Sequence, residues 1–137
     1  MSQLVLDCSV TMAWCFEDEC DRYADAVLTE LTRSEALAPC VWPLEVANVL
    51  LVAERRRRLE EADSHRFVSL LGELPIRVEV TLSERALDRL LALGRETGLA
   101  AYDAAYLDLA MRSGAPLATR DRLLRKACRK LGHTLFK

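Results

Sequence analysis

The chain has 137 residues, of which 51% are hydrophobic and 29% are charged, and its formal net charge is −2 at pH 7. These values predict one soluble globular domain over residues 1–137, and no apolar run approaches the roughly 20 residues that a membrane helix needs. The first predicted strand leaves no room for a signal peptide, and the five cysteines form no Cys-x-x-Cys pair. We therefore expect a cytoplasmic protein with reduced thiols, no zinc site and no contact with a membrane.

The first informative stretch is Leu-Val-Leu-Asp-Cys-Ser at residues 4–9. Three consecutive aliphatic residues predict a strand that is buried on both faces, as in a parallel sheet covered by helices. Asp7 follows where such a strand reaches the surface, and Ser9 is of a type that caps helices. Ligands bind at this carboxyl edge in open α/β sheets. From this stretch alone, Asp7 is either a helix cap or a chemically active group.

A helix at residues 21–32 and a strand at residues 37–41 come next. Pro43 then suits the first position of a helix, which places Glu45 in the first turn and Asn48 one turn later on the same face. The apolar surroundings predict a largely buried helix, in which a lone carboxylate is costly. Glu45 therefore either interacts with the N-terminus of its own helix or belongs to a site.

Four arginines at residues 55–58 end the same helix. Arg56 lies about 16 Å from Glu45 along the axis, at 1.5 Å per residue. The run is either a solvated face that stabilises the helix C-terminus or a contact for phosphates. A helix at residues 60–73, a more exposed strand at residues 76–80 and a helix opened by a capping box of Thr81 and Glu84 are predicted to follow.

Asp103 stands in the first turn of the next helix, whose Ala, Leu and Tyr residues lie all round it and predict burial. Asp108 is off that face, and we interpret it as solvated or structural. A strand at residues 117–119 precedes Asp121, just as residues 4–6 precede Asp7. We expect the last helix to turn its basic residues outward.

In a right-handed α/β arrangement, all four acids meet at one edge of the sheet, because two follow strands and two open helices that run back from it. Two carboxylates 4 Å apart repel by about 4 kcal/mol at an effective dielectric of 20, so such a cluster needs cations. An all-oxygen site without His or Cys suits Mg²⁺ or Mn²⁺, which can activate water and orient a phosphate. The residues predict a metal-dependent site for phosphoryl transfer or phosphodiester cleavage, formed by Asp7, Glu45, Asp103 and Asp121.

Four segments, in this order and spacing, resemble the PIN-domain ribonucleases of the VapC toxin type over essentially the full chain. They are Val-Leu-Asp-Cys-Ser (5–9), Pro-Leu-Glu-Val-Ala-Asn (43–48), Tyr-Asp-Ala-Ala-Tyr (102–106) and Thr-Arg-Asp (119–121). The resemblance implies a three-layer α/β/α sandwich with a mostly parallel central sheet. It also implies an endoribonuclease with one or two Mg²⁺ or Mn²⁺ ions, a homodimer, and inhibition by a small VapB-type antitoxin.

By position in these segments, Asp7, Glu45, Asp103 and Asp121 form an acidic quartet, the name used below. Ser9 and Thr119 are then supporting hydroxyls, with Asn48 as a further polar neighbour. The candidate RNA-binding residues are four flanking arginines: Arg55, Arg56, Arg120 and Arg122. Two alternatives stay open: a catalytically silent PIN-like domain that binds RNA or protein, and a haloacid-dehalogenase-like phosphotransferase. The second alternative requires an acid two residues after the first, where this chain has Ser9.

Overall fold

Four short parallel strands form the centre of the fold. The computed structural model describes residues 2–19, 21–82 and 84–137. The strands are β1 (Ser2–Leu6), β2 (Ser34–Ala38), β3 (Ile76–Val78) and β4 (Leu117–Ala118). They lie in the order β3-β2-β1-β4, and every pair is parallel. β1 occupies an interior position because Leu4, Val5 and Leu6 are at most 1% exposed and need cover on both faces.

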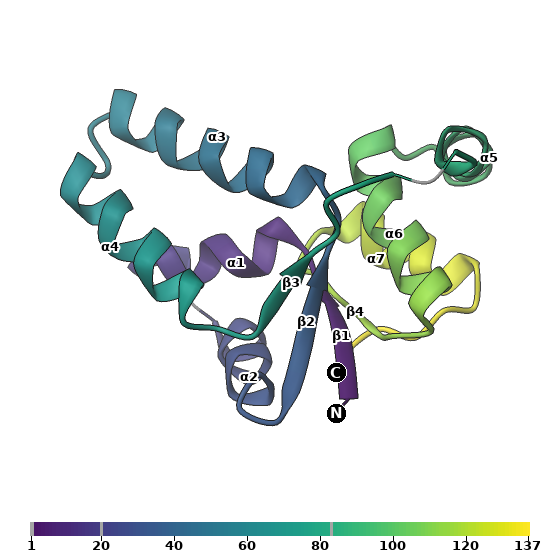
Figure 1. The fold of residues 1–137 in the computed structure, drawn as a ribbon, viewed down its shortest axis with the longest axis horizontal. Coiled ribbons are helices and arrows are strands. Elements are labelled where there is room, and N and C mark those ends of the chain that lie inside the picture. The colour runs from purple at the N-terminus through teal and green to yellow at the C-terminus, as the bar shows by residue number, and fades with distance from the viewer. Residues whose placement is uncertain (1, 20, 83) are drawn as a thin grey trace.

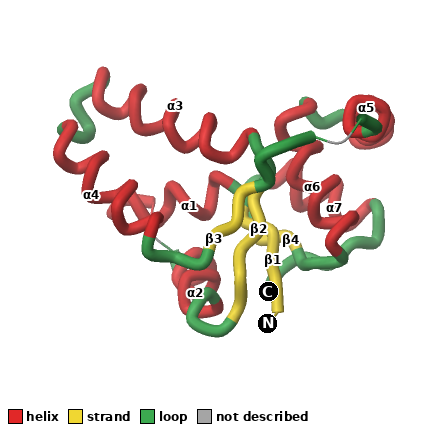
Figure 2. Tube along the Cα trace, viewed as in Figure 1, coloured by secondary structure: helices red, strands yellow, loops and turns green. Residues whose placement is uncertain are grey.

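Helices cover both faces of this sheet. Those in the described ranges are α1 (Cys8–Cys15), α2 (Arg22–Glu30), α3 (Val41–Arg55), α4 (Glu61–Gly72), α5 (Ala86–Thr97), α6 (Ala101–Ser113) and α7 (Arg122–Lys130). Figure 1 shows α1–α4 on one side of the strands and α5–α7 on the other, and Figure 2 shows the same layers by type of element. None of these described helices is both long and apolar enough to cross a membrane. The predicted three-layer sandwich with a parallel sheet is confirmed.

The carboxyl edge of the sheet gathers several helix N-termini. α1 begins two residues after β1 ends, α3 begins three residues after β2, and α7 begins four residues after β4. Each N-terminus carries unpaired backbone N–H groups and the positive end of the helix dipole. This edge is therefore suited to carboxylates and to anionic ligands.

Two of the boundaries that differ from those predicted bear on the site. The second strand covers residues 34–38 rather than 37–41, because its register is set by parallel pairing of Ser34 with Ser2 and of Ala38 with Val78. Pro39 follows the strand, and its carbonyl accepts the first helical bond from Trp42 at 2.9 Å. α3 therefore begins at Val41, and Glu45 is its fifth residue rather than a residue of the first turn.

The predicted capping box of Thr81 and Glu84 is wrong. α5 begins at Ala86, with Arg85 in the cap position, and Thr81 is exposed. Asp108 has a structural role, which is one of the two roles predicted for it. Its side chain is buried in α6 and accepts hydrogen bonds from Arg89 Nε at 2.9 Å and Arg112 Nε at 2.8 Å. Arg112 also pairs with Glu79 just after β3, so this ion network joins α5, α6 and the edge of the sheet.

Candidate active site

The acidic quartet comes from four different elements that meet at the carboxyl edge. Asp7 caps α1 directly after β1, and Asp121 caps α7 after β4, where its Oδ1 accepts the backbone N–H of Leu124 at 2.9 Å. Glu45 lies in the second turn of α3, and Asp103 is the third residue of α6. The two readings of Asp7 are thus compatible, because the residue caps a helix and also lies among the other acids.

A network of hydroxyl groups holds the Asp7 carboxylate. Asp7 is 5% exposed, and its Oδ2 accepts hydrogen bonds from Ser9 Oγ at 2.6 Å and from Thr119 Oγ1 at 2.7 Å. Thr119 Oγ1 in turn accepts the backbone N–H of Asp121 at 3.0 Å, and Ser9 Oγ accepts that of Arg120 at 2.9 Å. The network ties the ends of β1 and β4 together, so the positions of Asp7 and Asp121 are coupled.

Glu45 is held by Tyr106 of α6, a residue for which the sequence predicted no role. The Tyr106 hydroxyl donates a short hydrogen bond to Glu45 Oε1, although the two residues are 61 positions apart. The Tyr106 side chain is completely buried in α6, whereas Glu45 is only partly buried. The signal available in the sequence was the spacing of Tyr106 three residues after Asp103, which puts both on one helix face.

Burial and repulsion from neighbouring acids disfavour ionisation of Asp7, Glu45 and Asp103. Burial raises the pKa of Asp7, of Glu45 and of Asp103 above the ordinary values. Repulsion from the other acids raises these pKa values further. Asp121 acts on Asp7, and Asp7 acts on both Glu45 and Asp103. Asp103 also acts on Glu45, and Asp121 also acts on Asp103. Hydrogen bonds from Ser9 and Thr119 oppose it at Asp7, as does Tyr106 at Glu45. The four carboxylates therefore form one electrostatic unit.

Comparison with known proteins identifies the family of this chain. A family model described as PIN domain matches residues 4–130. The chain belongs to the PIN domain family. Among curated proteins, it is 30% identical to Ribonuclease VapC3 of Pyrobaculum aerophilum over 122 residues, which are 89% of this chain and 92% of that protein. The resemblance inferred from the sequence is confirmed.

Two solved structures have the same fold as this PIN domain. PAE2754 of Pyrobaculum aerophilum superposes with a TM-score of 0.70 at 23% identity, covering 92% of this chain and 84% of its own. VapBC2 of Rickettsia felis, crystallised with a DNA fragment from the promoter, gives a TM-score of 0.70 at 9% identity. That match covers 98% of this chain and 97% of the other. At these identities the two structures support the fold alone.

The donor chemistry of the PIN domain site fits a hard divalent cation, because every candidate ligand is a carboxylate or hydroxyl oxygen. As the side chains stand, no three His, Cys, Asp or Glu residues within the described ranges are close enough to hold a metal ion. In this arrangement Asp7 accepts hydrogen bonds from Ser9 and Thr119, and Glu45 accepts one from Tyr106.

The other residues predicted from the sequence are distributed unevenly around the PIN domain. Ser9 and Thr119 contact Asp7, whereas the side chain of Asn48 is exposed on α3. Arg120 lies beside the site, but its Nε is 2.7 Å from Asp21 Oδ2. The remaining three arginines are exposed: Arg55 and Arg56 at the far end of α3, and Arg122 in the first turn of α7.

Asp103→Asn is expected to stabilise the metal-free PIN domain increasingly as the pH rises. Since the pKa of Asp103 is higher in the folded than in the unfolded protein, the folded state binds more protons between those two values. The stabilising effect of protonated Asp103 is therefore fully present below about pH 4, and it is lost as the pH rises through the raised pKa. Melting in EDTA across this range should show the variant gaining roughly 3–5 °C for each kcal/mol of repulsion removed. A difference in Tm that does not change with pH would contradict the shared electrostatics.

Tyr106→Phe is expected to slow any reaction at this site by about 10-fold to 100-fold, as for other residues that orient a ligand. The ring stays buried, while Glu45 loses its hydrogen bond and its pKa rises further, since this bond lowers it. The acidic limb of the pH–rate profile should move to higher pH, an effect that loss of packing alone does not produce. Tyr102→Phe is the matched control, because its side chain is 65% exposed. An unchanged profile for Tyr106→Phe would rule out its positioning role.

Proposed function

We propose that this PIN domain is a metal-dependent endoribonuclease that hydrolyses RNA phosphodiester bonds and serves as the toxin of a toxin–antitoxin pair. The observation that carries the proposal is that Asp7, Glu45, Asp103 and Asp121, from four different elements, come together at the carboxyl edge. The name Ribonuclease VapC3, carried by a relative that spans nearly the whole chain, supports RNA as the substrate. The haloacid-dehalogenase alternative is set aside, because the chain belongs to the PIN domain family.

The quartet residues would hold one or two Mg²⁺ or Mn²⁺ ions, which supply positive charge for the phosphate and lower the pKa of a bound water. The protein's own contribution is to position the oxygen ligands. Ser9 and Thr119 orient the carboxylate of Asp7, and Tyr106 orients that of Glu45. Asp103 has no comparable side-chain anchor among the described contacts, so it is the acid with the most freedom to adjust to a ligand.

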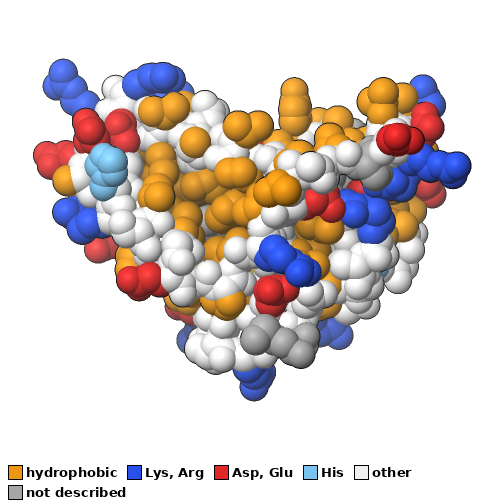
Figure 3. Space-filling view, in the orientation of Figure 1, with side chains coloured by type: hydrophobic (Ala, Val, Ile, Leu, Met, Phe, Trp, Pro, Cys, Tyr) orange, Lys and Arg blue, Asp and Glu red, His pale blue; other side chains and the backbone are white. Residues whose placement is uncertain are grey.

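We further propose that a small VapB-type antitoxin binds this protein and that the protein forms a homodimer. The complex named VapBC2, which shares this fold, supports the antitoxin. An apolar groove of about 630 Å³ between α3 and α4 could accept one of its segments, and Figure 3 shows hydrophobic side chains gathered in this hollow.

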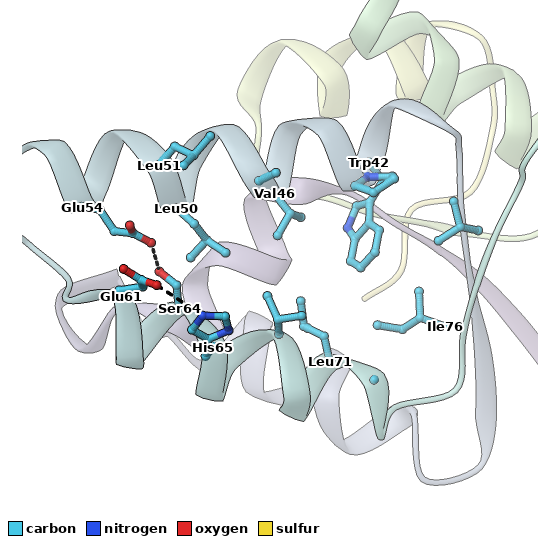
Figure 4. A pocket seen from close by; sticks show the side chains of 15 residues that line it. Trp42, Val46, Leu50, Leu51, Glu54, Glu61, Ser64, His65, Leu71 and Ile76 are labelled. Carbon is cyan, nitrogen blue, oxygen red and sulfur yellow. Dashed lines mark hydrogen bonds and ion pairs between the residues drawn. The ribbon is translucent and has the colours of Figure 1, made fainter.

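Figure 4 shows Trp42, Val46 and Leu50 of α3 facing Leu71 of α4 and Ile76 of β3 across the groove. Glu54 and Glu61 lie at its far end, where Glu54 Oε2 accepts a hydrogen bond from Ser64 at 2.6 Å. Trp42 lies only three residues before Glu45 on α3, so the near end of the groove adjoins the acidic quartet. An antitoxin segment with apolar residues followed by an arginine would fit these adjoining surfaces. Its apolar residues would fill the groove, and its guanidinium would pair with the carboxylates of the quartet.

The test is cleavage of a labelled single-stranded RNA by the purified chain in Mg²⁺ or Mn²⁺, beside an Asp103→Asn preparation that reports contaminating ribonucleases. Discrete products from the wild type alone are expected. Intact RNA would favour the catalytically silent alternative. For the partner, the chain is co-expressed with the product of the neighbouring upstream reading frame, and a complex and relief of growth arrest are expected. Failure of both would reject the toxin role and leave the nuclease role standing.

A further inference from the structure

The exposed face of α7 carries a row of cations that begins beside the acidic quartet. Arg122, Lys126 and Arg129 are exposed and are spaced four and three residues apart, so they lie along one side of the helix over about 10 Å. With Asp121, Leu123 and Arg125 they line a shallow hollow of about 750 Å³. We call Arg122, Lys126 and Arg129 the α7 basic row. The hollow therefore joins a member of the quartet directly to positive charge.

These three cations form no ion pair with the described part of the chain. Among the residues that the structure describes, no carboxylate lies within ion-pair distance of any of them. Other arginines are committed: Arg120 to Asp21, Arg112 to Glu79 and Asp108, and Arg58 to Asp18 and Glu19. Unpaired surface cations in a row form a binding surface for a regularly charged polyanion.

The arginine run at the end of α3 is a weaker candidate for the same role. It lies about 16 Å along the helix from Glu45, whereas the α7 basic row begins next to Asp121. Arg58 of this run also packs over the Phe16 ring at 4.3 Å and pairs with acids of the adjacent turn. Those contacts hold the α3 end to residues 16–19, away from the site.

One exposed aromatic side chain on α6, next to a quartet residue, indicates an unpaired substrate. Tyr102 is 65% exposed although it is a large ring, and it immediately precedes Asp103 in α6. An exposed ring beside reactive groups can stack on a base, and stacking requires the base to be free of a duplex. The α7 basic row could hold the backbone while Tyr102 holds a base near the acids.

We propose that single-stranded RNA binds with its phosphates along Arg122, Lys126 and Arg129 of α7 and with one base on Tyr102, so that the phosphodiester between them faces the acidic quartet. This inference rests on the proposed function and names the surface that selects its substrate. Cationic contacts raise affinity for any sequence, so the α7 basic row sets affinity, and Tyr102 sets the preference for unpaired RNA.

The test compares two triple variants that each remove three cations: Arg122→Gln/Lys126→Gln/Arg129→Gln on α7, and Arg55→Gln/Arg56→Gln/Arg57→Gln on α3. Glutamine keeps helix propensity close to that of Arg and Lys. Fluorescence anisotropy with a labelled oligouridylate of about 12 nucleotides is measured in EDTA over a range of salt concentrations, and gels verify that the RNA stays intact. Each lost contact to a single strand removes about 0.7 from the log–log salt slope.

The α7 variant should therefore bind about 100-fold more weakly at about 0.1 M salt, with a slope smaller by about 2. The α3 variant should stay within about threefold of the wild type. Tyr102→Ala should lose about tenfold in affinity for the single strand, and Tyr102→Phe should retain it. These losses should leave the Tm unchanged, since the altered side chains are exposed.

Wild-type affinity and slope in the α7 variant, or an equal loss in the α3 variant, would overturn the inference. If the wild type cleaves RNA while the α7 variant binds it normally, only this inference fails. If the wild type neither binds nor cleaves RNA, the proposed function fails with it. An α7 variant that loses the antitoxin complex but keeps its RNA affinity would identify the row as a protein-binding surface and reject the RNA assignment.

Discussion

Asp103→Asn is expected to reduce RNA cleavage by about 1,000-fold while the fold stays intact. The substitution keeps the shape of the side chain and removes one negative charge from a set of carboxylates that interact with one another. Groups that stabilise charge in a transition state are typically worth two to three orders of magnitude each. Single substitutions of Asp7, Glu45 and Asp121 by the corresponding amides should give losses of similar size, and combined substitutions should add little, because the residues act as one unit.

Asp88→Asn is the matched control for this experiment. Asp88 lies in the first turn of α5, as Asp103 lies in the first turn of α6, but its side chain is exposed and outside the quartet. Activity should be wild type in this variant, and circular dichroism should verify the fold of each protein. Activity near wild type in all four quartet variants would show that the chemistry takes place elsewhere.

Removal of divalent cations with EDTA is expected to abolish cleavage, and excess Mg²⁺ or Mn²⁺ should restore it. The fold should persist in EDTA, because the core is built from buried apolar side chains such as Leu4, Leu107 and Leu124. A cation that binds only the folded protein should also raise the Tm, with about 2.7 kcal/mol of added stability at 100 times its dissociation constant.

This stabilisation separates binding from activity. Mn²⁺ should raise the Tm of the wild type and of Asp88→Asn, and the increase should be largely lost in Asp103→Asn, which has one ligand fewer. Undiminished cleavage in excess chelator would reject metal dependence. An equal rise of the Tm in all three proteins would instead place the cation outside the acidic quartet.

The sequence by itself was sufficient to predict the architecture and to name the acids that meet at the carboxyl edge. The run of aliphatic residues at 4–6 requires cover on both faces, which only a sheet between helices provides. The acids that follow β1 and β4, and those near the starts of α3 and α6, then come to one edge through right-handed connections. Local pattern is sufficient here because burial and chain direction depend on short stretches.

Features that depend on partners far apart in the chain were decided only by the tertiary structure. The bounds of β2 follow from pairing with β1 and β3, and this pairing moved the strand three residues earlier than propensity and Pro39 suggested. Tyr106 acquires its role from Glu45, 61 positions away. Arg120 forms an ion pair with Asp21, whereas Arg122 forms none among the described residues. The sequence does not give the distance between two charged side chains. That distance decides whether a charged side chain pairs within the protein or is available to a ligand.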